Sequence, residues 1–166
     1  MNFFKYFSFA ALLMLCSCKP TVSLSGATIP IEAKTVSVAF FTNNTSLGAP
    51  SLSQRFTEKL RDVVSQQTSL ALVKNNGDLQ FEGYIADYNV MPVAISGDQA
   101  AQNRLTITVN VIYHNKFEPD KNFERTFPRF ADFSSSENIA NKEPELVQEI
   151  YRQITEDVFN AAFNNW

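Results

Sequence analysis

The stretch Leu105–His114, LTITVNVIYH, decides the fold of this chain. Apolar and polar side chains alternate along it almost without a break, and a period of two is typical of a β-strand with one buried face. The buried side is expected to hold Leu105, Ile107, Val109, Val111 and Tyr113. The other side would carry Thr106, Thr108, Asn110, Ile112 and His114. A sheet with one covered face is therefore predicted around this strand.

Three further segments are predicted to be strands. Residues 34–41 alternate with Val36, Val38 and Phe40 on one face. Residues 79–90 place Leu79, Phe81 and Ile85 on one face and Tyr84 and Tyr88 on the other. Pro92 is expected to end this strand, and the polar residues 96–103 lead from it to Arg104. The fourth segment, residues 122–133, contains Pro128, which has no N–H for a β-ladder, so this strand is predicted to lie at an edge or to be bulged.

Two segments have the spacing of amphipathic helices. The first begins at Ser51 or Ser53, either of which suits an N-cap, and runs to about Gln67. Its apolar face comprises Leu52, Phe56, Leu60, Val63 and Val64. The second begins near Pro144, which suits a first helical turn. Its apolar positions are Leu146, Ile150, Ile154, Val158 and Ala161 or Ala162.

The order strand, helix, strands, helix predicts an α+β fold in which two helices pack on one face of a roughly four-stranded mixed sheet (β-α-β-β-β-α). The uncovered sheet face would then carry Phe41, Tyr84, Tyr88 and Ile112 among Thr and Asn side chains. A face that is part aromatic and part polar favours docking of a partner. The alternative is an ordinary solvated face with scattered apolar residues.

The N-terminal stretch Leu13–Pro20, LMLCSCKP, contains both cysteines of the chain. It follows a short apolar run behind Lys5, and this arrangement is typical of a secretory signal peptide over residues 1–17. Leu15 to Cys18 resembles a bacterial lipobox, so Cys18 is the predicted lipidation site, and Lys19 in place of an Asp favours the outer membrane. Two or three acyl chains would give a stable anchor. The alternatives are an ordinary cleaved signal with an incidental cysteine, or a C-x-C pair in a disulfide or metal site.

Residues 18–33 lack a helical or strand period and are predicted to tether the lipid to a single domain over residues 34–166. The formal net charge of −3 argues against nucleic-acid binding. The single histidine, His114, falls on the polar face of its strand, and the sequence contains no nucleophile elbow, P-loop or dinucleotide-binding motif. We therefore expect no enzymatic activity, no metal site and no cofactor.

Basic side chains outnumber acidic ones between Ala101 and Phe130. Arg104, Lys116, Arg125 and Arg129 are candidates for contact with phosphates or with an acidic protein wall. A solvated hairpin is the alternative interpretation.

Several stretches together resemble one known family: SLSQRFTEKLRD, GDLQFEGYIADYNVMPVAI, NRLTITVNVIY, FPRFADF and DVFNAAFNNW. They are similar to the Bacteroidota-type branch of the LptE family, the lipoproteins of lipopolysaccharide assembly in the outer membrane. The resemblance implies two helices against a four-stranded sheet, a place within the lumen of the β-barrel protein LptD, periplasm-facing lipid anchoring, and help in delivering lipopolysaccharide to the outer leaflet. Of the candidate residues, only Cys18 transfers from the family.

Three hypotheses follow from the sequence. The first is a lipid-anchored plug and assembly factor for an LptD-type barrel, with lipopolysaccharide as a further ligand. The second is a free-standing periplasmic lipoprotein that binds or carries envelope lipid, which requires an apolar pocket between helices and sheet. The third, an enzyme acting on envelope polymers, has no supporting group of residues.

Overall fold

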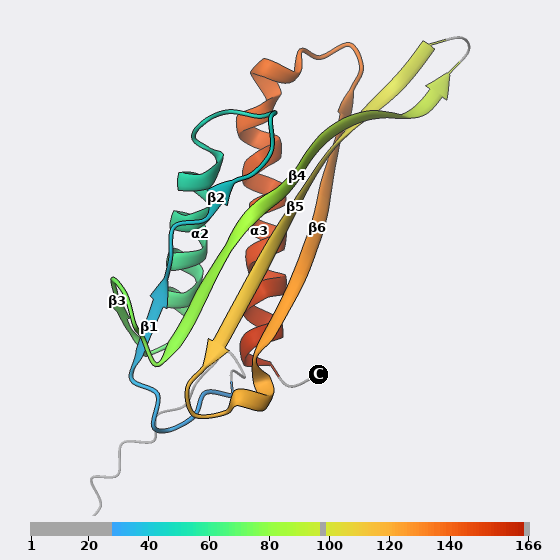
Figure 1. Ribbon diagram of the computed structural model, residues 1–166. Coiled ribbons are helices and arrows are strands. Elements are labelled where there is room, and N and C mark those ends of the chain that lie inside the picture. Colours follow the sequence, from blue (N-terminus) through green and yellow to red (C-terminus); the bar gives the residue numbers. More distant parts are fainter. Residues whose placement is uncertain (1–27, 97–98, 165–166) are drawn as a thin grey trace, which may run out of the picture.

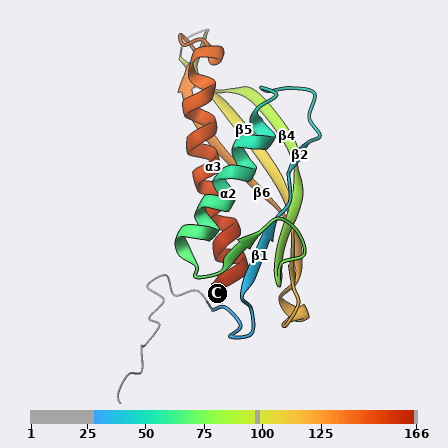
Figure 2. The ribbon, with the colours of Figure 1, turned by 90° about the vertical axis from the view of Figure 1, so that its left-hand side faces the viewer.

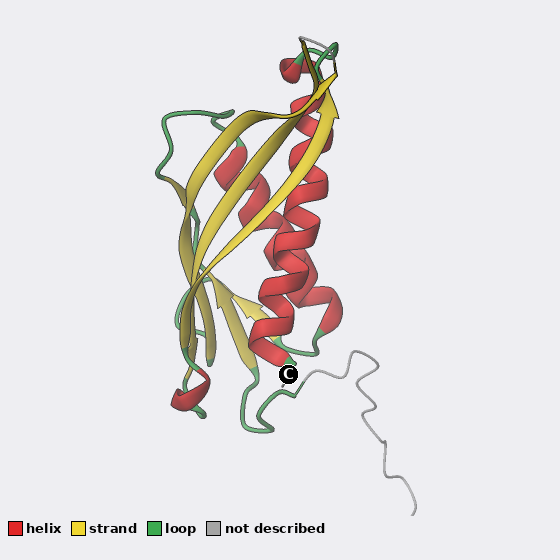
Figure 3. Ribbon diagram, turned by 90° about the vertical axis from the view of Figure 1, so that its right-hand side faces the viewer, coloured by secondary structure: helices red, strands yellow, loops and turns green. Residues whose placement is uncertain are grey.

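A computed structural model describes residues 28–96 and 99–164. Two helices, α2 (Leu52–Gln67) and α3 (Ile139–Phe163), cover one face of a mixed sheet (Figures 1 and 3). The predicted α+β class and the two-helix layer are confirmed. The signal peptide, Cys18 and the first part of the tether lie outside the described residues.

The sheet has six strands, of which two are very short. They are β1 (Thr35–Val38), β2 (Thr42–Asn43), β3 (Ala71–Val73), β4 (Leu79–Ser96), β5 (Gln99–Asn115) and β6 (Phe123–Ser134). Their order is β3-β1-β4-β5-β6, with β2 beside β4, and a single 3₁₀ turn (Pro119–Lys121) precedes β6. Strand β1 runs parallel to β3 and β4, whereas β4, β5 and β6 form an antiparallel meander. Four strands were expected, and the additional two are the short strands β2 and β3.

The alternation in β5 is the basis of the core. The five residues predicted for the buried side, Leu105, Ile107, Val109, Val111 and Tyr113, are buried. Helix α2 has the predicted bounds and buries the predicted face. Figure 2 shows α2 and α3 side by side over the sheet. Aromatic rings bridge the two layers, because Phe56 of α2 lies 4.9 Å from Phe41 and 5.1 Å from Tyr151 of α3, measured between ring centroids.

The prediction that Pro92 ends its strand is wrong. Strand β4 continues through Pro92 to Ser96, and β5 begins at Gln99, so the two strands form a long hairpin. Pro92 pairs with Asn103 beside a register shift between Pro92 and Ala94. A ladder irregularity tolerates a residue without an N–H, which explains why proline does not stop the strand. In Figure 1 this hairpin extends beyond the upper ends of the helices.

The second helix also begins earlier than predicted. Asn138 is its N-cap, with Oδ1 accepting a hydrogen bond from the Ala140 N–H at 2.9 Å, and Pro144 lies inside the helix. The Pro144 carbonyl accepts a hydrogen bond from Arg55 of α2 at 2.8 Å. A good N-cap and this contact between helices offset the backbone hydrogen bond that the proline cannot donate.

The predicted edge position of Pro128 is confirmed. Strand β6 pairs with β5 alone among the described strands, and Pro128 faces Thr108 across that pair. Pro128 thus lies in a strand that has a ladder partner on one side only among the described strands.

Candidate functional site

The sheet face away from the helices is the candidate site, and we call it the open face. Residues directly opposite each other in antiparallel strands point to the same side. The pairing therefore assigns to the open face Glu82, Tyr84, Thr106, Thr108, Asn110, Ile112, Glu124, Thr126, Pro128 and Phe130. Most of these side chains are partly or fully exposed. The face is mainly polar, with a few apolar groups spread across it.

Tyr84 lies on the open face, as predicted, opposite Asn110. Asn110 is buried although it belongs to this polar side. Its amide Nδ2 donates to Glu124 at 3.3 Å, and its Oδ1 has no hydrogen-bond partner within the part of the chain that the structure describes. His114 is exposed here as expected, with Nε2 3.6 Å from Glu82. The centre of the open face is thus a polar surface to which side chains of three strands contribute.

The placement of Phe41 on the open face is wrong. Between the pairs Val38↔Phe81 and Thr42↔Tyr84, the chain of β1 and β2 contains one residue more than β4. This extra residue reverses the alternation, so Phe41 is 0% exposed in the core while Phe40 is 58% exposed. Helix α2 holds the break in place: Arg61 donates to the Val38 carbonyl at 2.7 Å, and the Thr57 hydroxyl accepts from the Phe41 N–H at 3.0 Å.

The placement of Tyr88 is wrong for the same physical reason. Ile85 pairs with Val109 and Asp87 with Thr108, so Ala86 is an extra residue in a β-bulge. A one-residue shift moves every later side chain to the other face. Tyr88 therefore faces Ile107 on the helix side, where it is buried and donates a hydrogen bond from its hydroxyl to Glu143 of α3 at 2.9 Å.

Arg104 is on the open face and is already paired. Its guanidinium donates two hydrogen bonds to Asp132 of β6, at 2.7 and 2.9 Å, and lies 3.6 Å from the ring centroid of Phe130. The hydrogen bonds from Arg104 hold the pKa of the Asp132 carboxyl below its ordinary value. Asp132 and Phe130 are open-face residues that the sequence did not single out. Phe130 and Asp132 are two residues apart on β6 and therefore point to the same side as Arg104. This spacing is the sequence signal that could have identified the three as a group.

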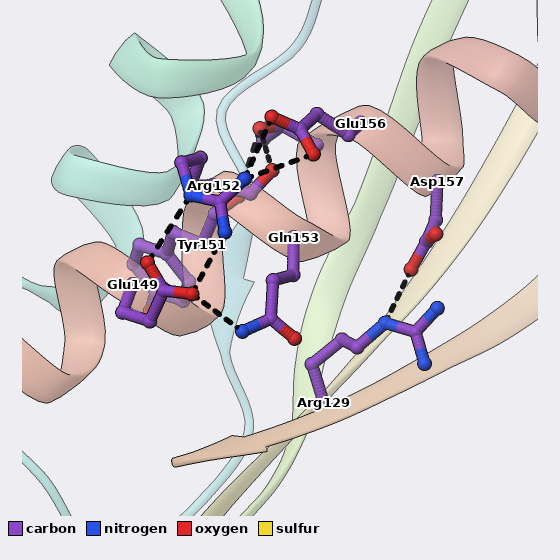
Figure 4. A network of polar contacts seen from close by, with 8 residues as sticks. Arg129, Glu149, Tyr151, Arg152, Gln153, Glu156 and Asp157 are labelled. Atoms are coloured by element: carbon purple, nitrogen blue, oxygen red, sulfur yellow. Dashed lines mark hydrogen bonds and ion pairs between the residues drawn. The ribbon is translucent and has the colours of Figure 1, made fainter.

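Arg125 and Arg129 lie on the helix side of β6, opposite Val111 and Ile107. Arg129 donates to Asp157 of α3 at 2.7 Å, so it fastens the edge strand to the helix (Figure 4). The same figure shows Arg152 of α3 between Glu149 and Glu156, at 2.7 and 3.0 Å. These hydrogen bonds from Arg152, with one from Gln153, lower the pKa of Glu149 to about 2. The outer face of α3 is thus a row of solvated, mutually paired charges.

Lys116 lies beyond the end of β5, and its Nζ is 3.9 Å from Asp78. The four basic candidates therefore occupy separate places: Arg104 on the open face, Arg125 and Arg129 on the helix side, and Lys116 at one end of the sheet. Of the four, Arg125 has no ion-pair partner among the described residues. It lies 5.3 Å from the Phe123 ring centroid, beside a surface cleft of about 370 Å³ to which Lys121 also contributes.

The described residues offer little for chemistry. Within residues 28–96 and 99–164, no three His, Cys, Asp or Glu side chains are placed to hold a metal ion. In these same ranges, neither helix combines the length and apolar character needed to cross a bilayer. A cleft of about 520 Å³ is a surface groove between Leu47, Tyr88, Val90 and the first turns of α3.

Comparison with protein families gives one match. The model of the LptE family, described as lipopolysaccharide-assembly, matches residues 33–162, which is nearly all of the folded domain. The chain belongs to the LptE family. Members of the LptE family are envelope lipoproteins of lipopolysaccharide assembly, and this is the function that membership gives the chain. A comparison with curated protein sequences found no match.

Solved structures share the LptE-like fold. An uncharacterized lipoprotein B from Nitrosomonas europaea is 13% identical, with a TM-score of 0.54 over 86% of this chain and 88% of that chain. A hypothetical protein from Chlamydia trachomatis is 14% identical, with a TM-score of 0.53 over 80% and 99%. The rare lipoprotein B from Shewanella oneidensis is 8% identical, with a TM-score of 0.50 over 75% and 89%. At these identities the likeness extends to the fold alone.

Proposed function

We propose that this protein is a lipid-anchored plug and assembly factor for an LptD-type β-barrel of the outer membrane. In this role it helps the barrel to form and to deliver lipopolysaccharide to the outer leaflet. The observation that carries the proposal is the LptE family match over residues 33–162. The lipobox ending at Cys18 supports the anchor.

The open face has the chemistry that a barrel lumen requires. The interior of a transmembrane β-barrel is polar, so a plug needs a surface that is mainly polar yet has apolar points of contact. Thr106, Thr108 and Thr126 provide hydroxyl groups across the three long strands, and Tyr84 and Phe130 provide the aromatic contacts. The helices bury the other face of the sheet, so the open face is the side of the sheet that is left for a partner.

The packing of the interior argues against the free-standing lipid carrier. Such a carrier needs an apolar pocket between helices and sheet. Here that space is filled by side chains that are almost completely buried, among them Phe56, Phe81, Val109, Ile154 and Phe159. The described clefts lie at the surface instead, and those near Arg125 and Tyr88 include polar side chains in their walls.

Direct contact with lipopolysaccharide belongs to the same proposal. Arg125 and Lys121 line one cleft together with Asp120, and cations beside a cleft suit phosphate groups. Lys121 is paired with Glu118 at 2.9 Å, so Arg125 is the cation of this cleft without an ion-pair partner among the described residues. Arg104, Lys116 and Arg129 each have a carboxylate partner already, so an anionic ligand would have to compete with it.

The decisive test is affinity purification of the tagged protein from outer membranes in mild detergent, followed by mass spectrometry. We expect a large β-barrel protein at near-stoichiometric yield. Recovery of the intact lipoprotein alone would contradict the proposal. In cells, depletion should lower lipopolysaccharide at the surface, and normal surface lipopolysaccharide after complete depletion would also contradict it.

A matched pair of variants maps the contact. Thr126→Arg adds a charge at an exposed position of the open face, and Gln148→Arg adds the same charge at an exposed position of α3. If the open face is the main contact, Thr126→Arg lowers recovery of the barrel more than Gln148→Arg does.

A further inference from the structure

The second half of β4 has one edge without a partner. Strand β2 pairs with β4 only at Tyr84 and Ile85, and no described strand lies beside β4 on that side beyond Ile85. Strand β5 pairs with the other side of β4 as far as Ser96. We call residues 87–91 of β4 the free edge. In Figure 1 this part of β4 leads into the hairpin that extends beyond the helices.

The free edge offers backbone hydrogen-bonding groups to a partner. In a β-ladder, every second residue directs its N–H and C=O to the same neighbouring strand. The Ile85 carbonyl accepts from the Asn44 N–H at 3.1 Å, so the backbone groups of Ile85 point away from β5. The β-bulge at Ala86 shifts this pattern by one residue. The N–H and C=O groups of Tyr88 and Val90 therefore point to the side that has no strand.

The groove of about 520 Å³ runs beside the free edge on the helix side of the sheet. Its walls are the loop before α2, β4 and the first turns of α3. Leu47 and Val90 line it and are 59% and 38% exposed, and Ile139 and Ala140 contribute from α3. Successive side chains of a strand point to opposite faces. A segment paired with the free edge would thus place every second side chain in this groove.

The charges around the groove are mainly negative. Glu143 lines the groove and Asp87 lies on the open-face side of the free edge, and neither has an ion-pair partner among the described residues. The other charged side chains nearby balance one another: Asp132, Glu137 and Glu145 against Arg55, Arg104 and Lys142. This surplus of carboxylates disfavours a phosphate-bearing lipid and favours a ligand with basic side chains.

The lipid tether and a second copy of the chain are poor occupants. The Thr28 N–H donates to the Phe163 carbonyl at the last turn of α3 at 2.7 Å, whereas the groove lies at the first turns. The 25 residues of α3 separate these places by about 37 Å. The stretch from Cys18 to Thr28 spans at most about 35 Å. A second copy would bring the same carboxylates together. The free edge therefore suits a different polypeptide.

We infer that the free edge binds an extended segment of the barrel protein by strand addition, with apolar side chains in the groove and a basic side chain beside Asp87. The inference rests on the proposed function, because it takes the barrel protein as the partner. The strands of a closed barrel are paired on both sides, so the segment belongs to a loop or a chain terminus within the lumen. In strand addition, main-chain hydrogen bonds give affinity and the pockets for alternate side chains give specificity.

Site-specific photo-cross-linking in cells tests this contact. The photoreactive residue p-benzoylphenylalanine replaces Leu47 in the tagged lipoprotein, or Leu72 in a matched control. Leu72 belongs to the edge strand β3 and is 44% exposed. The Ala71 N–H donates to the Lys34 carbonyl at 2.9 Å, so the backbone groups of Leu72 point away from β1. We expect a product that joins Leu47 to a loop or terminal segment of the barrel protein, identified by mass spectrometry, and little product at Leu72.

Val90→Pro tests the backbone hydrogen bond itself. It removes the outward N–H and leaves the pairing of β4 with β5, which already tolerates Pro92 two residues later. With the photoreactive residue at Leu47, we expect Val90→Pro to lower the yield of product about fivefold, the effect of one backbone hydrogen bond. Leu72→Pro removes an outward N–H at the opposite edge of the sheet and should leave the yield unchanged. Circular dichroism verifies that both variants are folded.

Three results would overturn the inference while the barrel protein still co-purifies: equal yields at Leu47 and Leu72, a lipid adduct at Leu47, or a product in a wall strand of the barrel. Equal effects of Val90→Pro and Leu72→Pro would overturn strand addition as well. Absence of the barrel protein from the purification of the unmodified lipoprotein would instead refute the proposed function, so the two failures are distinguishable.

Discussion

The hydroxyl of Tyr88 on β4 donates a hydrogen bond to the Glu143 carboxylate on α3, 2.9 Å away. The Ala49 N–H donates to the same Glu143 oxygen at 3.2 Å, so one carboxylate joins the sheet, the loop before α2 and the first turns of α3. This contact exists because the β-bulge at Ala86 turns Tyr88 toward the helices.

Tyr88→Phe should therefore lower the free energy of unfolding. A hydrogen bond to a charged acceptor contributes about 1.5–3 kcal/mol. We expect a loss at the lower end of this range, because Glu143 still accepts the hydrogen bond from the Ala49 N–H. Urea denaturation of the two proteins measures the difference. Tyr84→Phe, on the open face, is the control and should be nearly neutral. Equal losses in the two variants would contradict the assigned contact.

Stability should decrease at alkaline pH. Burial raises the pKa of the Tyr88, Tyr113 and Tyr151 hydroxyls above their ordinary value. The folded protein thus holds these protons more tightly than the unfolded chain, so this contribution is complete below about pH 10 and is lost as the pH rises above it. The midpoints of urea unfolding, measured from neutral pH to above about pH 10, report this loss of stability. A midpoint that stays constant through the range would contradict it, and Tyr88→Phe should show a shallower decline.

Phe41→Ala and Phe40→Ala should differ sharply although the residues are neighbours. Phe41 is completely buried against Phe56, and removing a buried phenylalanine costs about 3–5 kcal/mol. Phe40 is exposed, and its replacement should change stability by no more than about 0.5 kcal/mol. Thermal denaturation measures the loss of stability in each variant. A larger loss for Phe40→Ala would mean that the alternation continues unbroken through β1 and β2.

Gly83→Ala should disrupt the centre of the sheet. Gly83 has a φ of 154°, and a Cβ there would overlap the Asn110 carbonyl and the Phe41 ring. Backbone strain of this type costs about 1–3 kcal/mol, and the clash adds to it. Loss of near-ultraviolet circular dichroism is the measurement. Ala131→Gly, on the edge strand, should keep the native spectrum, and a native spectrum for Gly83→Ala would contradict the prediction.

Cys18→Ala should release the protein from the membrane. Without the thiol no acyl chains are attached, so the variant is expected in the soluble periplasmic fraction. Fractionation with detection of the tag measures this. Continued anchoring in cells that lack the barrel would contradict the assignment of Cys18.

The sequence predicts most of the architecture because each element has a clear period of its own. The alternation from Leu105 to Tyr113 and the apolar face of Leu52–Gln67 are properties of local stretches, and both are found as predicted. The predicted start of α3 is wrong because Pro144 also suits a first helical turn, whereas Asn138 provides the actual N-cap.

The faces of Phe41 and Tyr88 could not be predicted by extending a local alternation. One extra residue beyond Val38 and one at Ala86 reverse the alternation, and the first break is held by contacts with α2. The sequence contains a sign of the second break, at Ala86. The apolar residues Phe81 and Ile85 of this strand stand at odd positions, whereas Tyr88 and Val90 stand at even positions. Such a phase shift within a strand indicates a bulge.

The position of Pro128 has a consequence for the behaviour of many copies together. A lipid anchor confines proteins to a plane, where neighbours collide far more often than in free solution. A long edge strand with unpaired backbone N–H and C=O groups, such as β6, could then pair with the same strand of another molecule and start aggregation. Pro128 takes one N–H out of the backbone of that strand, and Arg129 ties the strand to Asp157. We therefore expect little pairing between the β6 edges of neighbouring molecules at the membrane.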